Sequence, residues 1–216
     1  MTINTDNLLE SILESLDRVD YIRAEEIPDI ALYMDQVTSI MEERLRASVR
    51  YPDTDKILTK TMINNYAKND LLPPPEKKKY SREHVLLLIF IYYFKGFLSM
   101  ADISRLLKPV TEEYFHSDRH ELSLKEVYET VFSMESDLVS DVKEDLKASF
   151  ERAQGIFEAV QDDKERECLQ NFAFICTLSF DVYMKKMMIE KMIDAMPEPE
   201  PQTKKKHEKK QEDTNE

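Results

Sequence analysis

The sequence predicts an all-α protein, and three observations lead to this prediction. Only two glycines occur among 216 residues, against eleven methionines, so little material is present for β-turns or glycine-rich phosphate loops. Apolar residues recur at helical spacing in several stretches of the chain. Hydrophobic residues make up 42% of the sequence, which is enough for a core and argues against wholesale disorder.

The first two predicted elements are amphipathic helices. Asp6 can cap the first, whose apolar positions follow an i, i+1, i+4, i+5, i+8 stripe: Leu8, Leu9, Ile12, Leu13 and Leu16. The second is expected at about 29–46, with Pro28 near its start. Its expected inward side chains are Ile30, Tyr33, Met34, Val37, Ile40, Met41 and Leu45.

Residues 58–69 are predicted to form a short helix with two different faces. At about 100° per residue, five polar side chains fall within an arc of about 140°: Lys60, Thr61, Asn64, Asn65 and Lys68. The opposite side is apolar: Leu58, Met62, Ile63, Tyr66 and Ala67. Lys, Thr and Asn hydrogen-bond phosphate oxygens and base edges, and no carboxylate interrupts this face. One face can therefore pack while the other touches a nucleic acid.

A basic loop, residues 76–82, is expected to follow a proline stop at 73–75, because proline lacks an N–H and disfavours helical geometry in the preceding residue. The loop carries the side chains Lys77, Lys78, Lys79, Tyr80 and Arg82. Residues 44–82 hold ten Lys or Arg and four acids, a net charge of +6, whereas the rest of the chain carries −19. Contact with a polyanion is therefore expected only in this segment, and it should weaken with salt.

Three further helices are predicted from caps and apolar spacing. Ser81 can cap an apolar helix through 85–94, and Ser99 with Asp102 resembles a capping box for a short helix that ends at Leu107 before Pro109. Ser123 with Glu126 repeats the capping box for a long helix toward Arg152.

A last helix is expected at about 164–196. Its apolar residues include Leu169, Phe172, Ile175, Cys176, Phe180, Tyr183, Met187 and Met188. A core or dimer stripe explains the methionines at helical spacing better than a ligand groove does: Met184, Met187, Met188, Met192 and Met196.

Four segments follow from this pattern. We expect an N-terminal helix in 1–26, a head in 27–109, a helical dimerisation or interaction domain in 110–196, and a disordered charged tail in 197–216. The tail combines alternating Pro and Glu with lysine runs, and it cannot bury an apolar face.

The sequence predicts a soluble, cytoplasmic protein without a membrane partner. Its start lacks the basic and apolar regions of a secretory signal, and the most apolar run, 85–94, is shorter than the roughly 20 residues that cross a bilayer. Cys168 and Cys176 would lie about 12 Å apart on a helix, beyond disulfide reach, so we expect free core thiols in a reducing compartment.

No cofactor or enzymatic centre is expected. His116, Asp118 and His120 could offer two imidazoles and a carboxylate to a metal, but an exposed polar loop explains them better. The carboxylates are predicted on solvated helix faces without an acid–base pair. We therefore do not expect an enzyme.

Several stretches resemble the head of MerR-type regulators. They are Asn-Asn-Tyr-Ala-Lys-Asn-Asp-Leu-Leu-Pro-Pro-Pro at 64–75, Lys-Tyr-Ser-Arg-Glu-His-Val at 79–85 and Gly-Phe-Leu-Ser-Met-Ala-Asp-Ile at 96–103. Together with Ile-Pro-Asp-Ile-Ala-Leu-Tyr-Met-Asp-Gln-Val at 27–37, the chain looks closest to a bacterial family of domains of unknown function built around such a head, over about 27–107.

The resemblance implies a winged helix-turn-helix, DNA binding and transcription regulation, usually as a dimer. Asn64 stands where those regulators commonly carry Arg, and Asp70 replaces the usual Gly. The Gly-Phe turn is one residue longer, and about a dozen loop residues separate the two helices of the motif. Sequence preference and promoter twisting therefore do not transfer.

The hypothesis from the sequence is a regulator of double-stranded DNA. The polar face of 58–69 would enter the major groove, Lys77–Lys79 and Arg82 would grip phosphates, and Tyr80 would brace the wing. The last two helices would join two subunits, and the hypothesis includes an effector whose chemistry the sequence does not reveal. The alternative is an all-α protein-interaction module whose degenerate helix-turn-helix binds an acidic protein surface instead of DNA.

Overall fold

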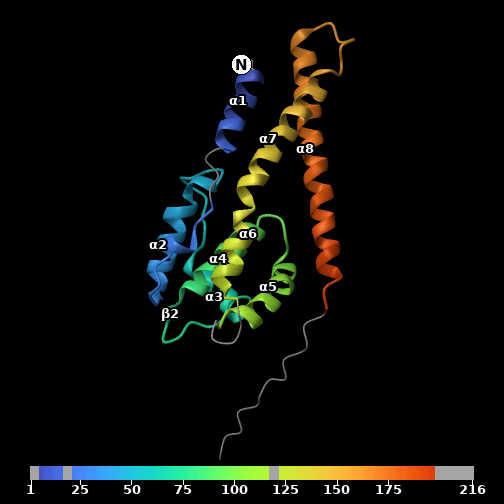
Figure 1. Cartoon of the computed structure of the whole chain (residues 1–216). Helices are drawn as coiled ribbons and strands as arrows, with labels where there is room; N and C mark the ends of the chain where they lie inside the picture. The colour runs from blue at the N-terminus through green and yellow to red at the C-terminus, as the bar shows by residue number, and fades with distance from the viewer. Residues whose placement is uncertain (1–4, 17–20, 117–121, 198–216) are drawn as a thin grey trace, which may run out of the picture.

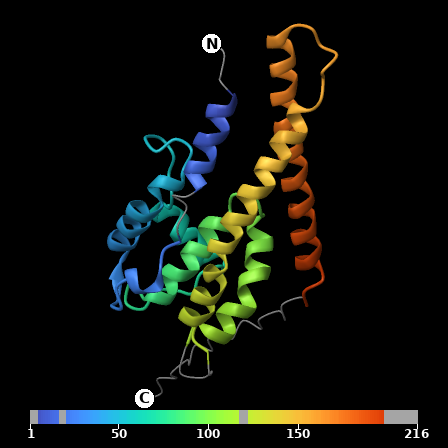
Figure 2. The same cartoon turned by 45° about the horizontal axis from the view of Figure 1, so that its top comes forward.

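The computed structural model describes residues 5–16, 21–116 and 122–197, and these are mostly helical (Figure 1). The all-α prediction is therefore confirmed. The helices are α1 (Thr5–Leu16), α2 (Met34–Leu45), α3 (Lys60–Lys68), α4 (Arg82–Phe94), α5 (Met100–Tyr114), α6 (Leu124–Ser133), α7 (Glu135–Gln154) and α8 (Asp163–Asp194). Short 3-10 turns lie at Ala24–Glu26 (η1) and Arg46–Ser48 (η2). Figures 1 and 2 show a body that contains α2 to α6, from which α7 and α8 extend as an antiparallel hairpin.

Helix α4 is the centre of the body. Every residue from His84 to Ile91 is buried, so the apolar run forms the expected internal helix. Helix α6 packs on it through Tyr128, which is fully buried and donates its hydroxyl hydrogen to the Ile22 carbonyl at 2.5 Å. None of the described helices combines the length and apolar character needed to cross a bilayer.

The predicted helix at 29–46 begins later than expected. Residues Leu32–Tyr33 form strand β1, which pairs antiparallel with β2 (Lys79–Tyr80) in the register Leu32 with Tyr80 and Tyr33 with Lys79. Helix α2 starts only at Met34. Ile30 and Tyr33 are therefore exposed, and their prediction as inward helical residues was wrong. A non-local strand pair decided this segment, and helical periodicity does not reveal such a partner.

Helix α5 continues through Pro109 to Tyr114, so the predicted end at Leu107 was wrong. The capping box at its start is present as predicted: the Ser99 side chain accepts from the Asp102 N–H at 3.1 Å. Leu107 and Phe115 are both buried, and packing on both sides of the proline offsets the missing backbone hydrogen bond. The expected segment boundary at 109 therefore falls inside α5.

The helix predicted from Ser123 toward Arg152 is divided at Met134 into α6 and α7. The Ser123 capping box is confirmed, since the Glu126 carboxylate accepts from the Ser123 N–H at 2.7 Å. Phe132, near the end of α6, packs on the main core. Helix α7 contributes instead to a second cluster of Phe150, Ala153 and Phe174, so the chain bends where it passes from one core to the other.

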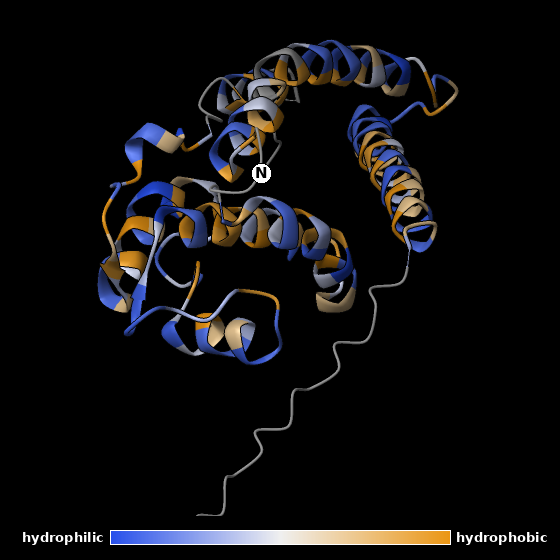
Figure 3. Ribbon diagram, turned by 60° about the horizontal axis from the view of Figure 1, so that its bottom comes forward, coloured by the Kyte–Doolittle hydropathy of each residue, from blue (hydrophilic) through white to orange (hydrophobic). Residues whose placement is uncertain are grey.

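Helix α8 matches the predicted extent of the last helix, and many of its large apolar side chains are turned to solvent. Its exposed fractions are 64% for Phe172, 60% for Ile175, 64% for Phe180, 65% for Tyr183 and 61% for Met188. These side chains are therefore not part of the core of this chain. Cys168 is also exposed, against the expected core thiol, while Cys176 is half-buried and both thiols are free. Figure 3 shows hydrophobic colouring along α8, which stands apart from the body in that view.

Candidate nucleic-acid interface

Helix α3 has the two faces that the sequence predicts. Its Thr59 cap accepts a hydrogen bond from the Met62 N–H at 3.2 Å. The buried side chains Ile63 and Tyr66 anchor it to the body, and Leu58 is buried just before it. The predicted contact residues are all exposed: Lys60, Thr61, Asn64, Asn65 and Lys68. Helix α3 therefore packs on the body with one side and exposes the other side to solvent.

The end of α3 is fixed by the backbone of the next residues. Asp70 has a left-handed φ of 55°, and the N–H groups of Leu71 and Leu72 both donate to the Tyr66 carbonyl, at 2.9 and 3.2 Å. Leu71 and Leu72 are themselves buried. This closes the helix before the three prolines and orients the chain that follows.

The basic loop forms a tight hairpin turn. The Lys79 N–H donates to the Glu76 carbonyl at 2.9 Å, and the two residues form a β-bridge. Lys77 and Lys78, at the two central positions, have φ values of 49° and 64°. Two positive φ values are the mark of a type I′ turn, which normally selects Asn and Gly. Both lysines are exposed at the tip, and a left-handed conformation costs each about 1–2 kcal/mol.

The base of this hairpin is fastened by β2. The Lys79 ammonium lies 5.0 Å from the centroid of the Tyr33 ring across the strand pair. Tyr80 is buried and meets the His84 ring edge-on at 5.4 Å between centroids. Burial raises the pKa of Tyr80. Tyr80 therefore lies inside the fold and supports the hairpin.

His84 connects three parts of this region. Its Nδ1 accepts from the Ser81 N–H at 3.0 Å, which places a histidine at the third position of the capping box that starts α4. Its ring also meets Phe115 edge-on at 4.8 Å. Burial lowers the pKa of His84, although the backbone carbonyls of Pro74 and Pro73 oppose that shift. Neutral His84 therefore holds the start of α4 beside the loop that leaves α3.

Several cations counted in the sequence are paired with acids. Arg82 is only 17% exposed in its side chain; its Nε donates to the Ile27 carbonyl at 3.3 Å, and its guanidinium lies 3.5 Å from the Asp29 carboxylate. Ion pairs also join Lys60 to Asp35, Arg44 to Glu26 and Arg46 to Glu42. These acids precede residue 44, so the count over 44–82 overstated the local positive charge. Within the described part of the chain, Lys68, Lys77 and Lys78 have no acidic partner within ion-pair distance.

The predicted DNA-contact side chains fall into an exposed group and a group behind the hairpin, and most of the candidate metal cluster around His116 lies outside the described residues. The polar face of α3 and the hairpin tip are exposed, whereas Tyr80 and Arg82 are structural neighbours behind the hairpin. Asp118 and His120 lie outside the described residues, and His116 is exposed. Across the described ranges, no group of three His, Cys, Asp or Glu side chains could hold a metal. Sequence reasoning missed His84, although Ser81 followed by a hydrogen-bond acceptor three residues later is a capping signal.

Residues 22–131 match the model of a family described as a domain of unknown function, DUF1836. The match covers about half of the chain, including α2 to α5, most of α6 and most of the main core. It confirms the expectation of a family of domains of unknown function, over a longer range than the predicted 27–107. The MerR-like head stays a prediction. Comparison with curated proteins and with solved structures gave no match.

Proposed function

We propose that this chain, which belongs to the DUF1836 family, binds double-stranded DNA and regulates transcription. The observation that supports this most is the surface of α3. Five polar side chains without a carboxylate project from a helix whose other side is buried. An α-helix of this kind fits the major groove, where Asn, Lys and Thr reach base edges and phosphates.

The order of elements supports a winged helix-turn-helix of the MerR type. Helices α2 and α3 are followed by the basic hairpin, referred to below as the wing (residues 76–80), and then by α4 and α5. Asp70 stands where MerR-type heads commonly carry Gly, and its φ of 55° is the conformation that glycine adopts without strain. The loop of 46–59 between α2 and α3 remains a departure from that pattern.

We propose different roles for the candidate residues, because their contacts differ. Asn64 and Asn65 read base edges, with Thr61 and Lys68 beside them on the α3 face. Lys77 and Lys78 bind phosphates from the wing tip, where no acid among the described residues pairs with them. On binding DNA, Lys60 leaves its ion pair with Asp35 and pairs with a phosphate instead. Three residues serve as supports rather than contacts: Lys79 over Tyr33, Tyr80 in the core, and Arg82 on the chain at 27–29.

A homodimer completes the proposal. Helix α8 carries an apolar stripe opposite the side that packs on α7, and it extends for about 27 Å from residue 169 to 187. Its members are Leu169, Phe172, Cys176, Phe180, Tyr183 and Met187. A second copy of the chain would cover this stripe and place two heads on half-sites one helical turn apart.

Fluorescence anisotropy with genomic DNA fragments at about 50 and 200 mM salt tests the DNA proposal. Asn64→Ala should reduce discrimination between selected and random DNA, at a cost of about 1–3 kcal/mol on the selected site. Lys78→Ala should weaken both DNAs alike and reduce the salt slope by about 1. Lys147→Ala, an exposed lysine on α7, is the matched control and should change neither.

Equal losses on both DNAs for Asn64→Ala and Lys78→Ala would refute these roles. Absence of sequence-selective binding by the wild-type chain would favour the second candidate, a protein-interaction module. The pairing of four cations with acids and the net charge of −13 support that candidate, because both oppose non-specific DNA association.

A further inference from the structure

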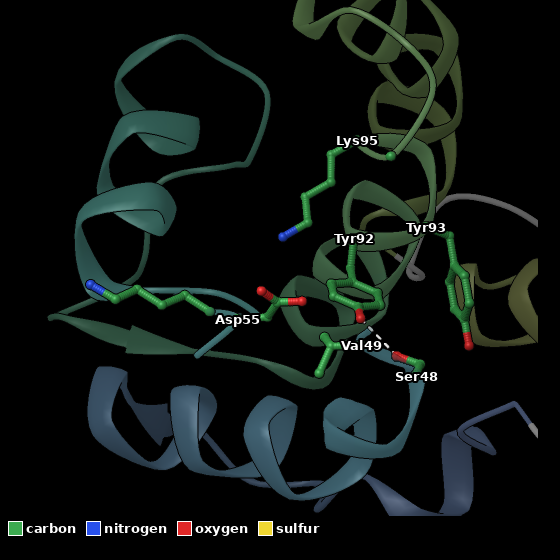
Figure 4. A pocket seen from close by; sticks show the side chains of 8 residues that line it. Ser48, Val49, Asp55, Tyr92, Tyr93 and Lys95 are labelled. Atoms are coloured by element: carbon green, nitrogen blue, oxygen red, sulfur yellow. Dashed lines mark hydrogen bonds between the residues drawn. The ribbon is translucent and has the colours of Figure 1, made fainter. Parts of the chain in front are cut away.

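A pocket lies between the loop that leads into α3 and the end of α4. Its volume is about 410 Å³, which is within the range of small-molecule sites. Ser48, Val49 and Asp55 line it from one side, and Tyr92 and Lys95 line it from α4. Figure 4 shows the Lys95 side chain, the Asp55 carboxylate and the Tyr92 ring directed into the same space.

Two opposite charges in this pocket are not paired with each other. Among the described residues, the Lys95 ammonium donates one hydrogen bond, to the Ile57 carbonyl, and lies 4.8 Å from the Tyr92 ring centroid. An ammonium has three N–H donors, so two remain for a ligand. The Asp55 carboxylate accepts from the Tyr51 N–H at 3.0 Å through one oxygen. No ion pair within 4 Å joins Lys95 to Asp55 in the described part of the chain.

Burial makes the charge of Lys95 costly. It lowers the pKa of Lys95, and a carboxylate placed beside the ammonium would offset that effect. A simple anion would also face the Asp55 carboxylate, which repels it. Lys56 lines the pocket too, but it is exposed, so water can solvate its ammonium without a ligand.

We propose that this pocket binds a small zwitterion, an α-amino acid with an apolar side chain. Its carboxylate pairs with the Lys95 ammonium and its ammonium pairs with the Asp55 carboxylate. Its side chain lies against Val49 and the Tyr92 ring, whose hydroxyl is held by Ser48 at 2.7 Å. Both unpaired charges are thereby satisfied by one molecule.

The position of the pocket couples it to α3. The Lys95 ammonium holds the carbonyl of Ile57, which is fully buried and lies two residues before the Thr59 cap of α3. A ligand carboxylate bound to the two remaining donors should draw the Lys95 ammonium toward it and, through the third donor, displace the Ile57 carbonyl. The amino acid therefore acts as an effector that shifts the chain at 57–59, just before α3, and changes DNA affinity. This regulatory role rests on the proposed function, whereas binding of the amino acid does not.

Isothermal titration calorimetry of the full chain without DNA tests the binding step. L-leucine and L-phenylalanine are compared with 3-phenylpropionate, which lacks the ammonium, and with phenethylamine, which lacks the carboxylate. Lys95→Met and Asp55→Asn should each weaken binding of the amino acid about tenfold or more, because each removes a hydrogen-bonded charge. Lys147→Met, an exposed lysine on α7 outside the pocket lining, is the matched control and should change it less than about threefold.

Circular dichroism establishes that each variant is folded, and the isosteric Asp55→Asn tests the proposal even if Lys95→Met unfolds the chain. Binding of 3-phenylpropionate as tight as that of L-phenylalanine, or wild-type affinity in Asp55→Asn, would overturn the zwitterion assignment. No binding by any of the twenty amino acids at about 10 mM would overturn the site.

The regulatory role is tested by DNA binding. Addition of an amino acid that binds in the calorimeter should change DNA affinity by about fivefold or more. A chain that binds the amino acid but never DNA would retain the site and refute the proposed function alone.

Discussion

The wing tip provides a test in which stability and DNA binding should change in opposite directions. Lys77 and Lys78 occupy a type I′ turn with φ values of 49° and 64°, which costs a side chain other than Gly or Asn about 1–2 kcal/mol per residue. The double variant Lys77→Asn/Lys78→Gly restores the preferred pair. The two positions together cost about 2–4 kcal/mol. Glycine loses about 0.5–1 kcal/mol more chain entropy on folding, so we expect a net gain of at least about 1 kcal/mol in the free energy of unfolding.

The same variant removes two phosphate contacts in the proposed complex. Each neutralised phosphate contributes about 0.9 to the slope of log affinity against log salt. The slope of the double variant should therefore be smaller in magnitude by about 1.8. Both lysines are exposed and have no acid within ion-pair distance among the described residues, so no folded-state ion pair is lost with them.

Thermal unfolding and anisotropy on one preparation measure both effects. A gain of about 1 kcal/mol raises the Tm of a chain of this size by about 2–4 °C. Lys147→Gln/Lys164→Gln removes the same charge from exposed positions on α7 and α8 and should leave the salt slope unchanged. A stabilised Asn-Gly variant with the wild-type salt slope would show that the wing does not touch phosphates. Unchanged stability would instead refute the turn assignment.

Three further outcomes follow from the structure. Burial lowers the pKa of His84. The contribution of His84 to stability is therefore complete above its ordinary pKa of about 6.5 and is lost as the pH falls through the lower folded-state pKa. In urea titrations, His84→Gln should reduce the loss of unfolding free energy over that pH range. Pro109→Ala should raise the free energy of unfolding by about 1 kcal/mol or more, measured the same way, because it restores an N–H inside α5. Phe180→Glu should convert the proposed dimer to monomer in light scattering while circular dichroism stays unchanged; a wild-type monomer would refute the dimer.

Short-range features of this chain were predictable from its sequence. The sidedness of α3 follows from residue spacing over nine positions, and the caps at Ser99 and Ser123 follow from residues three apart. The break before the three prolines is equally local. In each case the deciding interactions lie within one or two helical turns.

Long-range pairing explains the features that the sequence did not reveal. Strand β1 replaces the expected start of α2 because residues 32–33 meet 79–80. Arg82 is held by Asp29, more than fifty residues earlier, so its availability to DNA cannot be judged from its neighbours in sequence. Helix α8 shows the same limit differently, because spacing identifies an apolar stripe without stating whether this chain or a second one covers it.

Helix α4 connects the two ends of the proposed mechanism. Its first turn holds His84, which is in contact with Tyr80 of the wing and lies beside the loop that leaves α3. Lys95, the residue that follows it, donates a hydrogen bond to the Ile57 carbonyl on the chain that enters α3. The residues from His84 to Ile91 are buried, and a close-packed interior transmits strain. A ligand that shifts the end of α4 at Lys95 should therefore move the wing and α3 together, and His84→Gln should weaken its effect on DNA affinity without weakening ligand binding.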